Sequence, residues 1–304
     1  MNSIIKKANY SYLDDGGRRN QFNMFPYIVM FGKERSTYDL CFALALLTIP
    51  VLFYALRKKF EFSGKRTFFY VIFTLSFGLL SARLTSLIRD YFMELASNGA
   101  YEASEKLRNY GIPMFLPLFF LIYCLLFRDR FKDLMDYLAP GVYSVMTFVK
   151  LGCVLNGCCR GAPDPHGIMN VKAGYRTFPV QLYDMLTSIA IVVICIVLIY
   201  TLRKKHKGLI YPIGGILFAL TKGFWEGFRE HPEPWEKDFF DTGWTFWQFW
   251  MLILLVGCVF WLIMAIVWNR KGIPDFDEMS NLKFPQIKLL QKEKQPVIHH
   301  KKKK

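Results

Sequence analysis

The chain has 304 residues, of which 53% are hydrophobic and 17% aromatic, and its mean hydropathy is +0.21. This composition is too apolar for an ordinary soluble domain of that length, so it points to a membrane protein. The formal net charge of +15 does not require a nucleic-acid partner, because basic loops that face anionic lipid headgroups account for it.

Residues 1–37 are rich in Asn, Tyr and Gly, which predicts an external N-terminal arm. We expect no cleavable signal peptide, because the first long apolar run begins near residue 40, behind several Lys and Arg residues. Seven uncharged runs follow, and each continues past a single charge or glycine toward the roughly 20 residues that cross a bilayer. They cover residues 40–56, 67–82, 112–127, 137–149, 185–202, 208–221 and 242–269.

This pattern predicts an all-α, polytopic membrane protein with seven transmembrane helices in residues 38–269, followed by a basic tail over residues 270–304. Orientation follows from the short loops, because Lys and Arg are retained on the cytoplasmic side. Residues 57–66 hold five of them, residues 128–134 three and residues 203–207 four, whereas the longer alternate loops hold only two or three. The N-terminus is therefore predicted outside and the C-terminus in the cytoplasm.

Three polar strings interrupt the apolar sequence: KLGCVLNGCCRG (150–161), FPVQLYD (178–184) and KGFWEGFR (222–229). An ionisable residue inside a spanning segment is costly and by default marks a functional site. Lys222, Glu226 and Arg229 are spaced by four and three, so on a helix they share one face. Two cations and an acid on one stripe suit a lipid phosphate held by the cations, and they suit an internal salt-bridge ladder equally well.

The seven cysteines fall into two groups. Four lie in apolar runs, where cysteine behaves as a small hydrophobe: Cys41, Cys124, Cys195 and Cys258. The other three, Cys153, Cys158 and Cys159, cluster at the predicted outer end of the fourth helix, with His166 seven residues further on. Because no CxxC or HxxxH frame accompanies them, we expect no metal site and favour a disulfide or tight packing. His166 and His231 are predicted to be exposed loop histidines.

The polar strings resemble the signatures of the bacterial prolipoprotein diacylglyceryl transferase family. That family's G-R-x-G-N-F-x-N-x-E-x-x-G is similar to KLGCVLNGCCRG, its H-P-x-Q-L-Y-E to FPVQLYD, and its R-F-x-x-E-x-x-R to KGFWEGFR. Its S-x-Y-G and G-A-R-L are similar to STYD (36–39) and SARL (81–84), and DYLAPGV (136–142) resembles the stretch before the first signature. The resemblance covers about residues 25–268.

In that family, the diacylglyceryl group of phosphatidylglycerol moves to the thiol of a lipobox cysteine in a secreted precursor, which releases glycerol phosphate. The resemblance implies the same transfer here, in the bacterial cell membrane and without a cofactor. It implies phosphatidylglycerol, the prolipoprotein signal peptide and membrane lipids as partners, no nucleic acid, and a monomeric enzyme.

The resemblance also implies the site residues. The catalytic set is Lys150, Lys222, Glu226 and Arg229, and the substrate-binding set is Tyr38, Arg83, Asn156, Gly161 and Gln181. The cations would stabilise charge on the phosphate leaving group, Glu226 would orient them, and Asn156 would hydrogen-bond the headgroup. Other roles remain open, because Asn156 suits a helix cap, Arg83 a snorkelling interfacial residue and Tyr38 an aromatic belt.

The departures from the family pattern bear on activity. Lys150 and Lys222 replace family arginines and lack the bidentate fork that grips phosphate, while Cys153 and Cys158 replace an asparagine and a glutamate. No histidine stands near residues 110–111, where the family's H-G-G is expected, so a desolvated lysine is the remaining candidate base. Two other classes stay open: a non-catalytic lipid- or lipopeptide-binding protein, and a small transporter, for which inverted repeats are missing.

Overall fold

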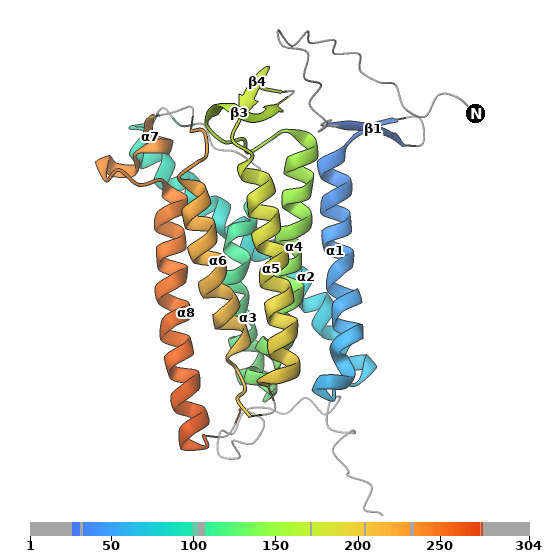
Figure 1. The fold of residues 1–304 in the computed structure, drawn as a ribbon. Coiled ribbons are helices and arrows are strands. Elements are labelled where there is room, and N and C mark those ends of the chain that lie inside the picture. Colours follow the sequence, from blue (N-terminus) through green and yellow to red (C-terminus); the bar gives the residue numbers. More distant parts are fainter. Residues whose placement is uncertain are drawn as a thin grey trace, which may run out of the picture.

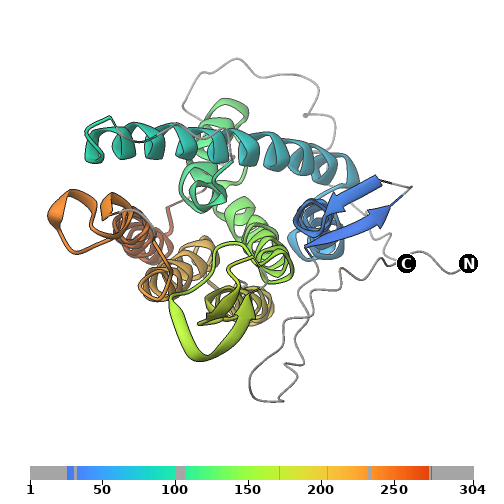
Figure 2. The same ribbon diagram turned by 90° about the horizontal axis from the view of Figure 1, so that it is seen from above.

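The computed structural model describes residues 26–30, 33–99, 101, 107–170, 172–203, 205–231, 234–273 and 275. The long helices are α1 (Thr37–Leu56), α2 (Gly64–Ala96), α3 (Ile112–Phe127), α4 (Phe131–Asn156), α5 (Val180–Thr201), α6 (Ile210–Glu226) and α8 (Phe246–Lys271). Most of the long helices run roughly parallel and form a bundle (Figure 1), while α2 crosses one side of it obliquely (Figure 2). Short elements join them: η1 (Arg57–Phe60), η2 (Asn109–Gly111), α7 (Pro234–Lys237) and η3 (Phe239–Asp241).

The predicted membrane fold is confirmed, with a correction to its count. Each of the seven apolar runs lies mainly within one of the long helices. Within the described part of the chain, six helices are long and apolar enough to cross a membrane, and the sixth run forms α6, which has only 17 residues. The helix α2 continues to Ala96, so the predicted outer loop from residue 89 begins later than expected.

The helix α4 lies at the centre of the bundle. In its most apolar window 78% of the residues are buried, compared with 28% in α1, α5 and α8. It packs on α1, α5, α6 and α3, and Figure 2 shows it enclosed by its neighbours when the bundle is viewed from above. Small residues permit this approach: a Cβ added at Gly141 would lie 2.7 Å from the Phe53 ring. The polar string at the end of α4 is therefore enclosed by protein and does not face lipid.

Two small antiparallel hairpins, which the sequence did not predict, lie at one end of the bundle (Figure 1). The first pairs β1 (Tyr27–Met30) with β2 (Lys33–Ser36) and leads directly into α1. The second pairs β3 (Pro163–Asn170) with β4 (Tyr175–Thr177) between α4 and α5. The all-α prediction was thus incomplete at this end. The rest of the predicted arm and most of the basic tail lie outside the described residues.

The basic loops gather at the opposite end of the bundle (Figure 1). The fully buried carboxylate of Asp133 pairs there with Arg203 at 3.1 Å, Lys207 at 3.0 Å and Arg130 at 3.5 Å. The Arg203 guanidinium also lies 3.9 Å from the centroid of the Phe60 ring, which ties the loop after α5 to the loop after α1. The two ends of the bundle therefore differ in charge and in structure.

Candidate active site

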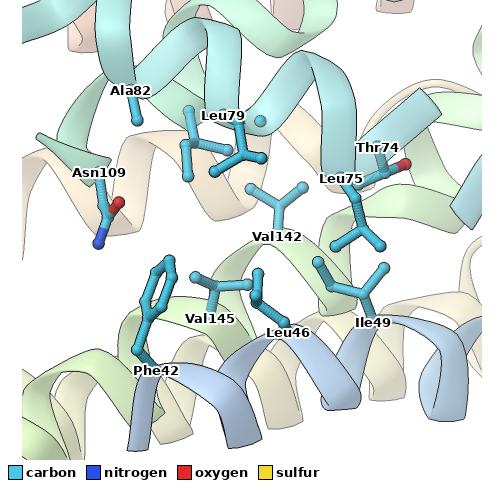
Figure 3. Close-up of a pocket in the computed structure, with 12 residues that line it drawn as sticks. Phe42, Leu46, Ile49, Thr74, Leu75, Leu79, Ala82, Asn109, Val142 and Val145 are labelled. Carbon is cyan, nitrogen blue, oxygen red and sulfur yellow. The ribbon is translucent and has the colours of Figure 1, made fainter. Parts of the chain in front are cut away.

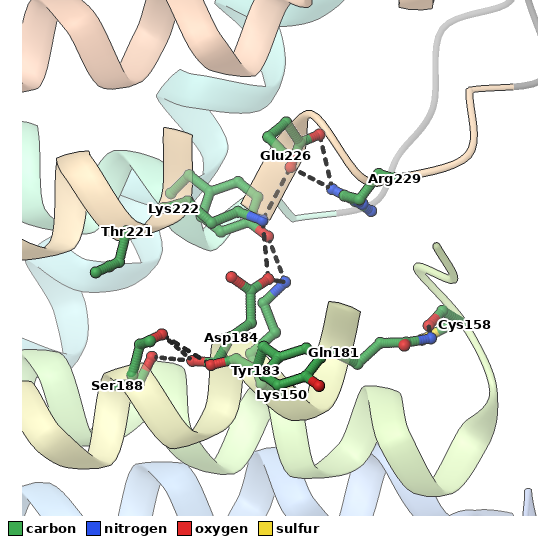
Figure 4. Close-up of polar contacts among 12 residues, drawn as sticks. Lys150, Cys158, Gln181, Tyr183, Asp184, Ser188, Thr221, Lys222, Glu226 and Arg229 are labelled. Atoms are coloured by element: carbon green, nitrogen blue, oxygen red, sulfur yellow. Dashed lines mark hydrogen bonds and ion pairs between the residues drawn. The ribbon is translucent and has the colours of Figure 1, made fainter. Parts of the chain in front are cut away.

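A buried row of alternating charges joins α4, α5 and α6 near the end that carries the hairpins (Figure 4). The Oδ2 atom of Asp184 lies 2.7 Å from Nζ of Lys150 and 2.9 Å from Nζ of Lys222. Lys222 also lies 2.8 Å from Oε2 of Glu226, whose carboxylate accepts hydrogen bonds of 3.0 Å from Arg229. The side chains of the first four residues are at most 4% exposed, and that of Arg229 is 14% exposed. We call these five residues the charged row.

The composition of the charged row is chemically informative. Three cations face two carboxylates, which leaves one net positive charge inside the protein. Buried charges are tolerated when they are paired and hydrogen-bonded, and removal of one partner is costly. Tyr110 adds to the pairing: its hydroxyl accepts a 2.6 Å hydrogen bond from Lys150, and its ring centroid lies 5.0 Å from Nζ of Lys222. The row therefore suits an additional anion.

Sequence reasoning missed Asp184, although its signal was present. Asp184 lies in α5 directly before the uncharged run, and the rule that selected Lys150 applies to it as well. It is the acid that pairs with both lysines of the row, since Lys150 and Lys222 both approach its Oδ2 atom. Without it the α4 and α6 parts of the row would not be joined.

Arg229 reaches the row from a loop and not from a helix as expected. The helix α6 ends at Glu226, and the following segment is held by an isolated bridge between Gly161 and Arg229. A Cβ at Gly161 would lie 2.3 Å from the carbonyl oxygen of Phe178, so only glycine fits there. Burial by itself would lower the pKa of Arg229, but the Glu226 carboxylate holds that pKa well above its ordinary value. The guanidinium is therefore permanently charged, and Gly161 acts through the backbone that positions it.

His231 corrects a prediction. It was expected to be an exposed loop histidine, but its side chain is only 12% exposed and its Nε2 atom lies 3.8 Å from Oε1 of Glu226. That nitrogen is buried and has no hydrogen-bond partner among the described residues. Burial lowers the pKa of His231, so its ring is neutral at neutral pH. His166, in contrast, is exposed as predicted.

The predicted substrate-binding residues differ in their burial and in their contacts. Asn156 donates a hydrogen bond of 2.9 Å to the Ser36 hydroxyl and accepts a hydrogen bond from Lys172, so it links three segments. It does not act as a helix cap, because Gly157 is the capping residue of α4. Gln181 donates a hydrogen bond of 2.8 Å to the Cys158 carbonyl. Tyr38 is half-buried beside Gly152, where an added Cβ would lie 3.2 Å from its ring. Arg83 is exposed on α2 and does not join the charged row.

All seven cysteines are free, so of the two alternatives for the Cys153 cluster, a disulfide or tight packing, the disulfide is not formed. The four in the helices are buried, as predicted: Cys41, Cys124, Cys195 and Cys258. Cys153 is buried in the last turn of α4, and Cys158 and Cys159 are half-buried just beyond it. The three Sγ atoms lie within 4.8 Å of one another, so these residues form one cluster beside the charged row.

Comparison with known proteins identifies the family to which this site belongs. A family model described as prolipoprotein diacylglyceryl transferase matches residues 26–267, from β1 to the last helix. The chain belongs to this family. Among its relatives, phosphatidylglycerol–prolipoprotein diacylglyceryl transferase 2 of Clostridium perfringens is 22% identical over 212 residues, which cover 67% of this chain and 82% of the relative. The transferase of Clostridium tetani is 24% identical over 210 residues, which cover 64% and 83%.

Membership in the diacylglyceryl transferase family gives the charged row a context. Tyr110 stands near the position at which the family's histidine is expected, and its hydroxyl contacts Lys150. Lys150 and Lys222 are held between carboxylates and this tyrosine. A lysine bound in this way supplies a fixed point charge, whereas an arginine would also supply paired donors.

Proposed function

We propose that this protein transfers the diacylglyceryl group of phosphatidylglycerol to the thiol of a prolipoprotein lipobox cysteine. The observation that carries the proposal is the charged row, a net-positive and largely enclosed set of fixed charges in a membrane protein of this family. The names of the relatives from the two Clostridium species supply the substrate pair.

In the proposed reaction the phosphodiester binds beside Lys150, Lys222 and Arg229. Phosphatidylglycerol carries one negative charge, and the departing glycerol phosphate gains a second as the carbon–oxygen bond breaks. Fixed cations in an enclosed site stabilise such developing charge, which is usually the largest catalytic contribution. Asp184 and Glu226 hold the cations in place, so they need not reorganise during the reaction.

We propose that α6 is the seventh spanning helix and that the N-terminus is outside. The gathering of the basic loops at one end of the bundle supports this orientation, because Lys and Arg are retained in the cytoplasm. The hairpins and the charged row then lie toward the outer leaflet, where a secreted precursor presents its thiol. We further propose that the protein works as a monomer in the bacterial cell membrane.

A small apolar pocket lies between α1, α2 and α4 (Figure 3). It is lined mainly by aliphatic and aromatic side chains, among them Phe42, Leu46, Leu79 and Val145. Asn109, at one end of the pocket, directly precedes the tyrosine that contacts Lys150. With a volume of about 30 Å³ the pocket is too small for an acyl chain, so the tails of a bound lipid would lie outside it.

The experiment that tests the proposal is expression of this chain in a bacterial strain depleted of its own transferase, followed by electrophoretic analysis of lipoprotein modification. We expect modified lipoprotein with the natural chain and none with Arg229→Ala. A second candidate function has support of its own: every cation of the row already has a carboxylate partner, as in a lipid-binding protein that has lost its chemistry. Phosphatidylglycerol binding without modification would favour that function.

A further inference from the structure

The cluster of Cys153, Cys158 and Cys159 is built into a turn that brings the three thiols together. The backbone reverses at Gly157, with φ +73°, and again at Cys159, with φ +55°. The backbone amide of Gly157 donates a hydrogen bond of 2.9 Å to the Cys153 carbonyl, and the Gln181 side chain donates one of 2.8 Å to the Cys158 carbonyl. A side chain with positive φ is uncommon outside glycine, so this conformation is maintained by its surroundings.

The spacing of the sulfur atoms fits a thiolate-bound metal ion. Zinc binds thiolate at about 2.3 Å, so three sulfurs around one tetrahedral ion lie roughly 3.8 Å apart. The three Sγ atoms already lie within 4.8 Å of one another, and closure around an ion needs only small rotamer adjustments. Sulfur ligands select zinc over hard cations such as magnesium, and three protein ligands with an open fourth position are typical of catalytic zinc.

The cluster is also next to the charged row. Cys153 lies one turn after Lys150 on the same face of α4, and Gly161, two residues after Cys159, is bridged to Arg229. A small molecule bound at the cluster would therefore lie close to a phosphate bound by the row.

We propose that Cys153, Cys158 and Cys159 bind a thiophilic divalent metal ion such as Zn²⁺, and that its open position takes the acceptor thiol. The proposal rests on the function proposed above and answers the question that the missing family histidine raises. A thiol that coordinates zinc is deprotonated. Its proton passes to water, its sulfur forms the carbon–sulfur bond, and the carbon–oxygen bond to phosphate breaks. The bonding electron pair leaves with glycerol phosphate, and the metal keeps its charge.

The metal site is tested first, without any assay of activity. The full chain is purified in detergent under reducing conditions, stripped with a chelator and titrated with Zn²⁺, and then with Cd²⁺ to follow the thiolate-to-metal absorption. We expect one equivalent of tightly bound metal per chain, lost in Cys158→Ala with Cys159→Ala and retained in Cys195→Ala, a buried cysteine of α5. Because Cys158 and Cys159 are only half-buried, these changes spare the core, and thermal unfolding verifies the fold.

Absence of stoichiometric metal, or recovery of the cluster as a disulfide with one free thiol, would show that these cysteines do not form a metal site.

The activity experiment compares zinc-loaded and stripped protein with phosphatidylglycerol and a lipobox peptide. We expect stripping to lower transfer at least tenfold and Zn²⁺ to restore it. Equal transfer by the stripped protein overturns thiol activation but leaves the transferase function standing, and loss in His231→Ala would then assign the proton to that histidine. No transfer by either form overturns thiol activation together with the transferase function, while metal stoichiometry still decides the site.

Discussion

Asp184→Asn tests the charged row most sharply, because one carboxylate oxygen serves two buried lysines. Lys222 keeps Glu226 at 2.8 Å after the change, whereas Lys150 keeps only the neutral hydroxyl of Tyr110 at 2.6 Å. One buried cation is therefore left without an acid. Removal of one partner of a buried ion pair costs roughly 3–5 kcal/mol, and we expect the lower end, about 3 kcal/mol, because asparagine still supplies an acceptor oxygen.

A double variant separates lost charge from lost packing. In Lys150→Met with Asp184→Asn, the cation and the acid are both absent, and Lys222, Glu226 and Arg229 keep one net positive charge. Replacement of a buried pair by groups of similar volume is often nearly neutral, so we expect recovery to within about 1 kcal/mol of the natural protein. Asp90→Asn is the matched control: Arg89 keeps Glu236 at 2.9 Å, so no buried cation loses its last acid, and we expect a smaller loss than in Asp184→Asn.

The assay is the free energy of unfolding in mixed micelles, measured for the four proteins under the same conditions. An Asp184→Asn variant that unfolds with the free energy of the natural protein would contradict the predicted loss, and so would a double variant no more stable than the single one. Either result would mean that water or lipid, and not Asp184, compensates Lys150.

Three further predictions concern binding and folding. Lys222→Ala removes a charge-assisted contact worth roughly 1.5–3 kcal/mol, so phosphatidylglycerol affinity measured in nanodiscs should fall at least tenfold, whereas unchanged affinity with a collapsed yield would indicate a purely structural ladder. Gly161→Ala places a Cβ 2.3 Å from the Phe178 carbonyl and should displace Arg229 and abolish transfer, while Gly257→Ala, with open space around it, should leave transfer unchanged. Burial lowers the pKa of His231 in the folded protein, so this histidine binds a proton more readily in the unfolded chain. The free energy of unfolding should therefore fall as pH drops below about 6.5, the ordinary pKa of histidine. An identical pH dependence in His231→Gln would contradict this.

The bundle was readable from the sequence, because hydrophobic runs of membrane length rarely occur outside membrane-spanning helices. The boundaries were less readable: α2 passes Arg83 and Arg89 without interruption, since Arg89 is buried against Glu236 and Asp90. Uncharged runs do not reveal such long-range compensation. The hairpins escaped prediction because their paired stretches are short, and their pairing depends on how α1, α4 and α5 place their ends.

The site was predicted in part. Lys150, Lys222, Glu226 and Arg229 stood out as charges in apolar sequence, and the structure brings all four together. Asp184 was missed because it lies just outside the uncharged run that predicted α5, and His231 because its burial depends on the loop after α6. The cysteine cluster was dismissed for lack of a known spacing motif, yet a reversed backbone turn brings its sulfur atoms together. Spacing alone does not encode that turn.

The most direct test of diacylglyceryl transfer is the release of glycerol phosphate from phosphatidylglycerol by the purified chain in the presence of a lipobox peptide. We expect release that requires the peptide cysteine, that matches thioether formation one to one, and that persists or rises in Lys150→Arg with Lys222→Arg, because arginine adds paired donors to the same charge. Phosphatidylglycerol binding with no release above the Arg229→Ala background would contradict the account and leave a lipid-binding protein of the transferase fold.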